Sequence, residues 1–594
     1  MTMLIGYAIT AAMISAMAML AISALMERKE ITRVLSSKGI LPIASLILLV
    51  IFFVAFSLLF VHPAEQLYFD ENIYQGIALN ILHSGSSTWC QYGSGSALSC
   101  PVSALYHDPA GISLLLAAAF AVFGASTGVA YSMELLFGAV SIFLMFLLAS
   151  SLLPSRKGVI ASTAVFALMP ELFIWSRAQA VPNLYFMAFT ILSFASFAMF
   201  MKHKTPWMLS MLLASITISS YMRIEGILLV PLFAVAYILY EGKGVIGRIY
   251  STIKAFDSNT YYMVATLAFL LLMLPQAYYL SYEFANPQYG QGSSGLFSLS
   301  SFESNVLGMG VSGQSCIMAG IAMGPNVCFF LGSYTSAGTY PTIFLGTDTA
   351  LAALGLLLLL AGYMKKSTRR EVLVLCALWI MVYYLFYGFF YAGSALYGVD
   401  VRFMLELLPP ISILGGISLS WIGSAPGAAY TSALRSRASR KSAEILNLCV
   451  MAAAAAILLA YPFWASIPVI TIPPSSMPQQ AVILNSVNFF YSNYSKVPAS
   501  CLVFTYTPDI WYEVNRSAAQ ISYLGSSDAG FLNFTKNYRC FVYDVGYWCN
   551  VPPDEHACSS SISRYHTKDL ASENLTSGFN DQSYGFYQLI NYSS

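Results

Sequence analysis

Long apolar stretches recur along most of this chain, and they constrain its fold more than any other feature. Several reach the roughly 20 residues that a helix needs to cross a bilayer core, where a helix satisfies its own backbone hydrogen bonds. Hydrophobic residues make up 57% of the 594 residues and charged residues only 9%, a balance outside the range of soluble globular domains. We therefore predict an α-helical polytopic membrane protein.

About twelve stretches fit membrane-spanning helices. The connections between them collect lysine and arginine on alternate sides, so the positive-inside rule makes the basic connections cytoplasmic. Both termini then lie outside the cytoplasm, and the first span is expected to be an uncleaved N-out helix, because no basic residue precedes it. The predicted spans are residues 4–25, 39–61, 128–153, 159–175, 184–201, 207–221, 227–240, 261–280, 347–363, 372–391, 403–421 and 445–464, and the basic connections lie within 28–38, 156–157, 202–204, 243–254, 365–370 and 435–441.

The chain divides into four parts on this topology. Residues 1–38 form an extra N-terminal span with its cytoplasmic connection, and residues 39–424 form a membrane core with outside loops at 62–127 and 281–346. Residues 425–465 form a basic cytoplasmic loop and the last span, and residues 466–594 form a small extracytoplasmic domain.

Two shorter patterns refine this division. The apolar run 112–123 is too short to cross comfortably and is predicted to be an interfacial helix, because a span there would place the later basic clusters outside. In the tail, 479–494 has helical character and 501–506 and 540–544 resemble short buried strands, which predicts a small α/β domain.

Cysteines occur in even numbers in each predicted outside segment, which indicates disulfides formed in an oxidising compartment. Buried free thiols are the alternative. The four tail cysteines allow three pairings, of which Cys501 with Cys540 and Cys549 with Cys558 is preferred, while Cys376 and Cys449 fall within spans. The other candidates are Cys90 with Cys100 and Cys316 with Cys328, and the tail also carries Asn-x-Ser/Thr triplets at Asn493, Asn515, Asn533, Asn574 and Asn591.

Three arginines stand apart from the basic connections and the tail. Arg177, Arg223 and Arg402 each lie at the predicted outer end of a span. Each could snorkel to the interface, but arginine also binds phosphate bidentately in a partly dehydrated site. Three at one depth suggest a lipid phosphate bound at the outer face.

Acidic residues cluster at the same level. Asp70 and Glu71 follow the second span, and His107 and Asp108 precede the interfacial helix. A carboxylate at such a place can deprotonate an acceptor hydroxyl. The alternative for an adjacent Asp-Glu pair is a solvated loop.

These elements, in this order and on this side of the membrane, resemble the GT-C glycosyltransferases. The likeness covers residues 39–424 and is closest to the branch of protein O-mannosyltransferases and lipid A aminoarabinose transferases. It includes the Asp70-Glu71 pair, the His-x-Pro element at His107, Ser176-Arg177 and the segment Arg402-Phe-Met-Leu-Glu-Leu-Leu-Pro-Pro410. The resemblance implies transfer of a hexosyl or pentosyl group, with inversion, from a polyprenyl- or dolichyl-phosphate carrier to a protein, glycan or lipid acceptor.

The resemblance also implies roles for single residues. Asp70 would be the general base or would position the acceptor, with Glu71 supporting it. Arg223 and Arg402 would hold the carrier phosphate, and His107, Asp108 and Glu225 would lie beside the phosphate or the acceptor. Arg177 would close the second outside loop over the site.

A divalent cation, Mg²⁺ or Mn²⁺, is a further implied component, with Asp70 as the candidate ligand. Asn183 stands where relatives often carry a second acidic residue, and the loss of that carboxylate puts metal binding in doubt. Glu134 stands near an expected arginine, and the intramembrane carboxylates Glu134 and Glu171 could compensate. Membrane lipids and an acceptor of unknown class are the other expected partners, and we expect no nucleic acid.

Two other classes of function stay open at this point. A transporter or flippase for a lipid-linked saccharide would need ionisable residues near the bilayer midplane. A noncatalytic membrane protein whose tail does the binding would make the arginines and the Asp-Glu pair incidental. The tail lacks a W-W-D-x-G element, which argues against an oligosaccharyltransferase.

Overall fold

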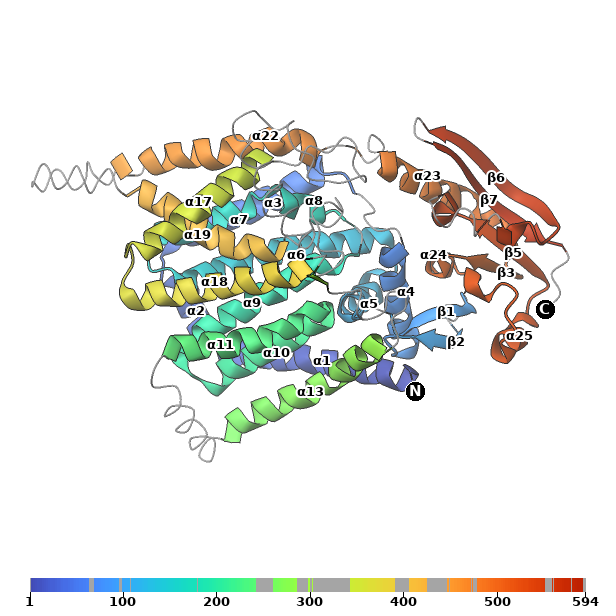
Figure 1. Ribbon diagram of the computed structural model, residues 1–594, viewed down its shortest axis with the longest axis horizontal. Helices are drawn as coiled ribbons and strands as arrows, with labels where there is room; N and C mark the ends of the chain where they lie inside the picture. Colours follow the sequence, from blue (N-terminus) through green and yellow to red (C-terminus); the bar gives the residue numbers. More distant parts are fainter. Residues whose placement is uncertain are drawn as a thin grey trace, which may run out of the picture.

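The computed structural model describes residues 2–63, 69–95, 99–106, 108–178, 180–241, 260–285, 298–299, 302, 342–389, 405–424, 446–447, 449–471, 473, 478–550, 558, 560–577 and 580–590. Its helices lie side by side in one body, and a sheet domain covers one end of that body (Figure 1). The predicted class, a helical membrane body with a small C-terminal domain, is confirmed in this form.

Eight helical segments among the described residues are long and apolar enough to cross a membrane. Some lie at the periphery and others at the centre: the apolar window of α3 is 17% buried, whereas that of α9 is 89% buried. Apolar surface left exposed on peripheral helices would be stable against lipid. The eight segments are α1 (Thr2–Met26), α3 (Ile40–Phe60), α6 (Thr127–Leu152), α9 (Pro182–His203), α13 (Thr260–Ala285), α18 (Lys366–Phe389), Leu405–Ile422 with α19 (Leu408–Ile422), and Cys449–Pro468 with η5 (Ala456–Ala460) and part of α22 (Tyr461–Ile470).

The predicted count of about twelve spans is not confirmed, because the remaining helices are shorter. The expected span 159–175 is two helices, since Pro170 has no N–H to continue the first and instead begins the second. The run 112–123 is a separate helix, as predicted. The shorter helices are α2 (Arg28–Ser36), α4 (Phe69–Ser84), α5 (Gly111–Phe123), α7 (Arg156–Ala167), α8 (Pro170–Trp175), α10 (Pro206–Met222), η1 (Ile224–Leu228), α11 (Leu229–Glu241) and α17 (Thr342–Leu360).

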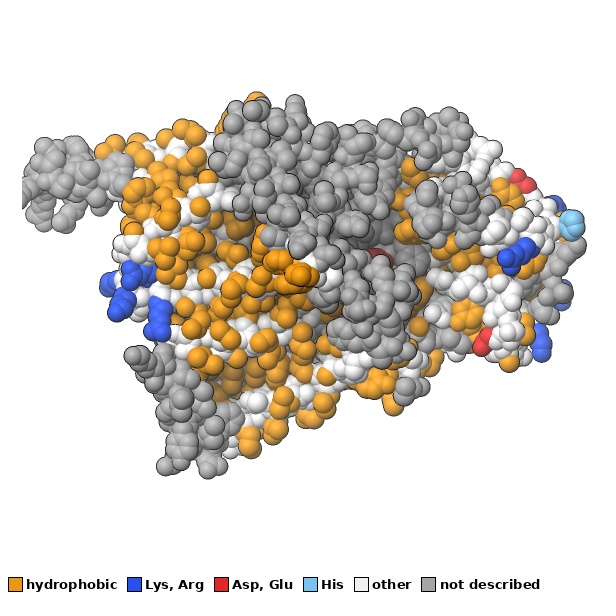
Figure 2. All heavy atoms as spheres, viewed as in Figure 1, with side chains coloured by type: hydrophobic (Ala, Val, Ile, Leu, Met, Phe, Trp, Pro, Cys, Tyr) orange, Lys and Arg blue, Asp and Glu red, His pale blue; other side chains and the backbone are white. Residues whose placement is uncertain are grey.

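Basic connections meet at the end of the body that lies away from the sheet domain. Lys38 donates to the carbonyl oxygen of Leu153 at 2.7 Å, and Lys202 donates to that of Ser151. Figure 2 shows Lys and Arg side chains gathered at this end, with hydrophobic side chains covering the band between it and the sheet domain. The described basic connections therefore share one end, while their cytoplasmic placement stays a prediction. The connections 243–254 and 435–441 lie outside the described residues.

The C-terminal domain is an α/β domain, as predicted, built on a seven-stranded sheet with the order β2-β1-β4-β3-β5-β7-β6. Its central strands β4, β3 and β5 are parallel, and the flanking strands pair antiparallel. The strands are β1 (Trp89–Ser94), β2 (Ser99–Ala104), β3 (Cys501–Thr505), β4 (Ser517–Gln520), β5 (Cys540–Val545), β6 (Thr567–Ser577) and β7 (Asn580–Leu589), and the domain's main helices are α23 (Pro478–Asn493), α24 (Pro508–Glu513) and α25 (Ala529–Thr535).

Two strands of this sheet come from the predicted first outside loop, residues 62–127, rather than from the tail. In β1, Tyr92 and Gly93 pair with Ala519 and Ala518 of β4. Residues 62–127 were assigned as a whole to the membrane core, and no strand was predicted among them. The loop instead joins the core to the C-terminal domain through a continuous sheet.

Three disulfides confirm most of the cysteine predictions. They join Cys90 with Cys100, Cys501 with Cys540, and Cys549 with Cys558, so the preferred tail pairing is the one that forms. Cys376 is a buried free thiol and Cys449 an exposed one. Cys316 and Cys328 lie outside the described residues, and their pairing stays a prediction.

Candidate active site

Helix α4 carries the predicted carboxylates in its first turn, at the end of the helical body that faces the sheet domain (Figure 1). The positive end of a helix dipole stabilises negative charge at this position. Glu71 is completely buried, whereas Asp70 is half-buried. Of the two, Asp70 is therefore the carboxylate that a bound molecule could reach.

Two tyrosines hold the site's carboxylates. Tyr106 donates its hydroxyl hydrogen bond to Oδ1 of Asp70, and Tyr74 donates to Oδ2 of Asp108 at 2.5 Å. The two tyrosine rings meet edge to face with their centroids 5.9 Å apart. Tyr279 of α13 in turn donates to the backbone oxygen of Tyr106 at 2.8 Å. Asp70 and Asp108, which come from different parts of the loop, are thereby each bound to one of two tyrosines whose rings touch.

The electrostatics of Tyr74 place an arginine in the same group. Burial raises the pKa of Tyr74 well above its ordinary value, and the negative charges of Asp108 and Asp70 raise it further, while Arg223 opposes the shift. The phenol therefore keeps its proton and stays a donor to Asp108. Arg223 is close enough to Tyr74 and to Asp108 for its charge to act on both.

Arg223 is buried and paired rather than exposed at a membrane interface. It follows α10, and its Nη2 lies 2.8 Å from Oε1 of Glu225 in η1, with side-chain exposures of 9% and 2%. Its charge also interacts with Asp108 and with Glu406 at the start of the segment Leu405–Ile422. A buried arginine needs such partners, because an uncompensated charge there would cost several kcal/mol. The pairing holds a cation among the carboxylates.

The other predicted residues are placed differently. Arg177 follows α8 and donates through Nε to the backbone oxygen of Val61 at 3.4 Å, and its charge interacts with Tyr131. It therefore lies against the end of α3, and closure of a loop over the site stays a prediction. His107 and Arg402 lie outside the described residues.

The structure adds residues that the sequence analysis did not select. Tyr74 lies four positions after Asp70, on the same face of α4, so helical spacing could have indicated it. Glu406 lies four positions after Arg402, inside the segment that carried the family resemblance, and an acidic residue in a span was a signal in itself. Tyr106 precedes His107 directly and carried no signal of its own.

The described carboxylates do not form a ready metal site. Asp70 and Asp108 each accept a tyrosine hydroxyl, and Glu225 pairs with Arg223. Among the described residues, no group of three or more His, Cys, Asp or Glu side chains is arranged to hold a metal ion. A divalent cation with Asp70 as a ligand therefore stays a prediction.

Solved structures provide the comparison with known proteins. ArnT from Cupriavidus metallidurans, bound to undecaprenyl phosphate, matches over 92% of this chain and 98% of its own, with 12% identity and a TM-score of 0.53. The oligosaccharyltransferase from Archaeoglobus fulgidus matches over 90% of this chain and 74% of its own, with 12% identity and a TM-score of 0.50. No protein-family model matches the sequence, and a search of curated proteins finds no match.

Both structural neighbours are members of the GT-C superfamily. The chain therefore has the GT-C fold that its motifs led us to expect. The matched share of the chain is larger than residues 39–424, so the likeness of fold extends beyond the region that the sequence motifs covered.

Proposed function

We propose that this protein is a glycosyltransferase that moves a sugar from a polyprenyl- or dolichyl-phosphate carrier to an acceptor on the extracytoplasmic side of the membrane. One observation carries the proposal: Tyr106 and Tyr74 bring Asp70 and Asp108 together beside the buried Arg223, at one end of a GT-C fold. A base and a phosphate-binding cation are the two groups that this transfer needs.

Asp70 is the general base in this proposal. It removes a proton from the acceptor hydroxyl or amine while the acceptor atom bonds to the anomeric carbon of the sugar. The bond from that carbon to the phosphate oxygen breaks, and its electron pair stays on the phosphate, so a single displacement inverts the anomeric carbon. The hydrogen bond from Tyr106 orients the Asp70 carboxylate, and Glu71, packed behind it, supports α4.

Arg223 stabilises the leaving phosphate, together with Arg402. Glu225 fixes the Arg223 guanidinium, so little side-chain entropy is lost when phosphate binds. Asp108 lies beside the acceptor or the phosphate. Arg223, Glu225 and Tyr74 are buried, and a charge–charge attraction among buried groups is stronger than at an exposed surface.

A transporter is the alternative class, and no contact in the described structure favours it. Four of the carboxylates buried within the helical body lie near helix ends: Glu134 is the eighth residue of α6, Asp348 the seventh of α17, Glu171 is in the first turn of α8, and Glu406 is at the start of its segment. At 1.5 Å per residue, these positions are within about 12 Å of a helix end. Positions near helix ends do not by themselves indicate a polar path through the middle of the bilayer.

The testing experiment presents a panel of radiolabelled polyprenyl-phosphate and dolichyl-phosphate sugars to membranes that contain the protein. We expect transfer of label from at least one donor to endogenous acceptors, and none in matched membranes that lack the protein. If no donor supports transfer by protein shown to be folded and to hold its disulfides, the proposal is wrong.

A further inference from the structure

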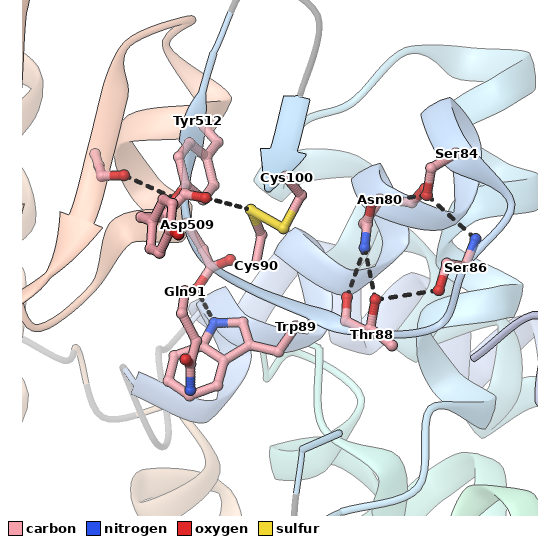
Figure 3. Close-up of a disulfide and its surroundings, with 12 residues drawn as sticks. Asn80, Ser84, Ser86, Thr88, Trp89, Cys90, Gln91, Cys100, Asp509 and Tyr512 are labelled. Atoms are coloured by element: carbon pink, nitrogen blue, oxygen red, sulfur yellow. Dashed lines mark hydrogen bonds between the residues drawn. A yellow bond between two sulfur atoms is a disulfide. The ribbon is translucent and has the colours of Figure 1, made fainter. Parts of the chain in front are cut away.

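The turn from α4 into β1 is tied back to the last turns of the helix (Figure 3). The amide nitrogen of Asn80 donates to the backbone oxygen of Thr88 at 2.8 Å and to its hydroxyl at 3.1 Å. Ser84 donates to the side-chain oxygen of Asn80 at 2.8 Å. These hydrogen bonds fix the turn to the last turns of α4. A contact that restrains the turn therefore also restrains the helix.

Besides the pairing of β1 with β4, the C-terminal domain contacts the start of β1, directly after this turn, through a buried hydrogen bond. The Trp89 indole nitrogen donates to Oδ2 of Asp509 in α24 at 3.0 Å, as Figure 3 shows, and Asp509 is completely buried. Asp509 also packs against Gly76 of α4. A Cβ atom at residue 76 would come within 1.7 Å of Oδ1 of Asp509, so only glycine permits this approach.

Helix α1, at the N-terminus, contacts the same turn. The backbone oxygen of Gly6 accepts hydrogen bonds from the hydroxyl of Ser87 at 2.9 Å and from its backbone nitrogen at 3.4 Å. A Cβ atom at residue 6 would lie 2.4 Å from the hydroxyl oxygen of Ser86. Three parts of the chain that are distant in sequence thus meet where α4 ends.

Trp89 also leads directly to the candidate base. Its ring meets that of Tyr106 edge to face, with centroids 5.8 Å apart, and Tyr106 donates to Asp70. Asp509, Trp89, Tyr106 and Asp70 therefore form a continuous series of contacts from the C-terminal domain to the site. Each of these side chains is at least half-buried, so the residues packed around it restrict its movement.

We propose that Asp509 and Trp89 are positioning residues: their hydrogen bond lets the C-terminal domain set the placement of Tyr106 and α4, and through them of Asp70. The inference rests on the proposed function, because it assigns these residues a purpose in that reaction. Displacement of a reacting group by about 1 Å can cost about 100-fold in rate. A contact that holds Asp70 indirectly can therefore change turnover without touching substrate.

The chain supplies a matched control for this hydrogen bond. Asp544 accepts the indole hydrogen bond of Trp511 at 2.9 Å, and both residues lie in the C-terminal domain. Asp509→Ala and Asp544→Ala each remove a buried carboxylate from a tryptophan, but only the first breaks a contact with α4 and β1. Asp509→Asn keeps an oxygen that can accept the bond, and Trp89→Phe keeps an aromatic ring while removing the donor.

The experiment measures kcat, donor KM and amide hydrogen exchange of residues 69–84 for the full-length variants in membranes or detergent. We expect Asp509→Ala and Trp89→Phe to lower kcat about tenfold or more with little change in donor KM, and to speed exchange in α4. Asp509→Asn should recover most of the turnover. Asp544→Ala should lower the unfolding temperature but leave turnover per folded molecule and α4 exchange unchanged.

Equal effects of Asp509→Ala and Asp544→Ala on kcat per folded molecule and on α4 exchange would overturn the inference, because both would then act only through domain stability. The exchange measurement needs no activity. If the wild-type protein transfers no sugar but Asp509→Ala still speeds amide exchange in α4, the proposed function fails, while the link between the C-terminal domain and α4 stands. If transfer occurs and Asp509→Ala changes neither kcat nor exchange, the link fails while the function stands.

Discussion

At the scale of single residues, burial separates groups that look alike in the sequence. Asp70 and Glu71 are adjacent, yet only Asp70 is accessible, while Glu71 is packed inward. Arg223 could have been an interfacial arginine, yet it is buried against Glu225. The sequence indicated the residue types, but exposure depends on tertiary packing, which no local pattern contains.

The pairing of Arg223 with Glu225 leads to a prediction about donor binding. Lysine has a point charge and cannot reproduce the planar guanidinium that binds Glu225 and phosphate together. We expect Arg223→Lys to raise the donor KM roughly 10-fold to 100-fold. Arg516→Lys in the C-terminal domain is the control and should leave donor KM unchanged. An unaltered KM in Arg223→Lys would show that this arginine does not hold the carrier phosphate.

The raised pKa of Asp544 predicts how the stability of the C-terminal domain depends on pH. Burial raises its pKa to about 6, although the hydrogen bonds from Trp511 and Thr505 oppose the shift. Because the folded-state pKa exceeds the unfolded value, this carboxyl group stabilises the fold below about pH 4, and that stability is lost as pH rises through about 6. The change is at most about 3 kcal/mol.

The test compares the pH dependence of the domain's unfolding temperature in the wild type and in Asp544→Asn. The asparagine oxygen can accept the same two hydrogen bonds and does not titrate. Relative to this variant, the wild type should lose stability between about pH 4 and pH 6. A wild-type protein that gains stability relative to Asp544→Asn over that interval would disprove the assignment.

At the scale of elements, glycines set how closely the core helices approach. Gly416 of α19 faces α7, and a Cβ there would come within 2.0 Å of the Ser162 hydroxyl oxygen. Its neighbour Gly415 has room, because a Cβ there would lie 3.6 Å from Leu351. Small residues at such crossings allow membrane helices to pack closely.

Adjacent glycines therefore allow a matched pair of substitutions. Gly416→Ala should lower the unfolding temperature in detergent and reduce the yield of folded protein, because α7 and α19 must separate. Gly415→Ala should be tolerated, because alanine there makes ordinary contacts and also favours helix. Similar behaviour of the two variants in a thermal unfolding assay would contradict the close approach of these helices.

Elements with local signals were predictable, and long-range pairings were not. Strands β3 and β5 were visible as short apolar runs, and even cysteine numbers indicated the disulfides. Strands β1 and β2 were missed, because β1 is stabilised by pairing with β4, from the far end of the chain. Similarly, Trp89 gave no sign of its partner Asp509, since no sequence pattern links the two.

At the scale of the whole molecule, the basic connections at one end of the helical body imply a membrane orientation. Both termini lie toward the sheet domain, away from the basic connections (Figure 1, Figure 2). With Cys449→Ser as background, Ser527→Cys on the sheet domain should react with an impermeant thiol reagent on intact cells. Ser37→Cys, at the basic end, should react only after the membrane is opened. The reverse labelling would invert the proposed topology and exclude catalysis on the extracytoplasmic side.

The molecule joins a helical GT-C body to a sheet domain through the loop that also contributes Tyr106 and Asp108. Helix α4 and this loop therefore connect the apolar helical body to the sheet domain, which we propose lies outside the cytoplasm. This arrangement suits an enzyme whose donor is held in the membrane and whose acceptor comes from outside. The central claim is that Asp70 acts as the base where the two meet.

The most direct measurement of that claim is sugar transfer from the productive lipid-phosphate donor by wild type, Asp70→Asn and Glu71→Gln, each normalised to folded protein. We predict that Asp70→Asn lowers kcat at least about 100-fold while donor KM changes little, since general-base catalysis contributes that much. Glu71→Gln, which alters a buried supporting group, should retain more turnover. Transfer by Asp70→Asn at the wild-type rate would contradict the account.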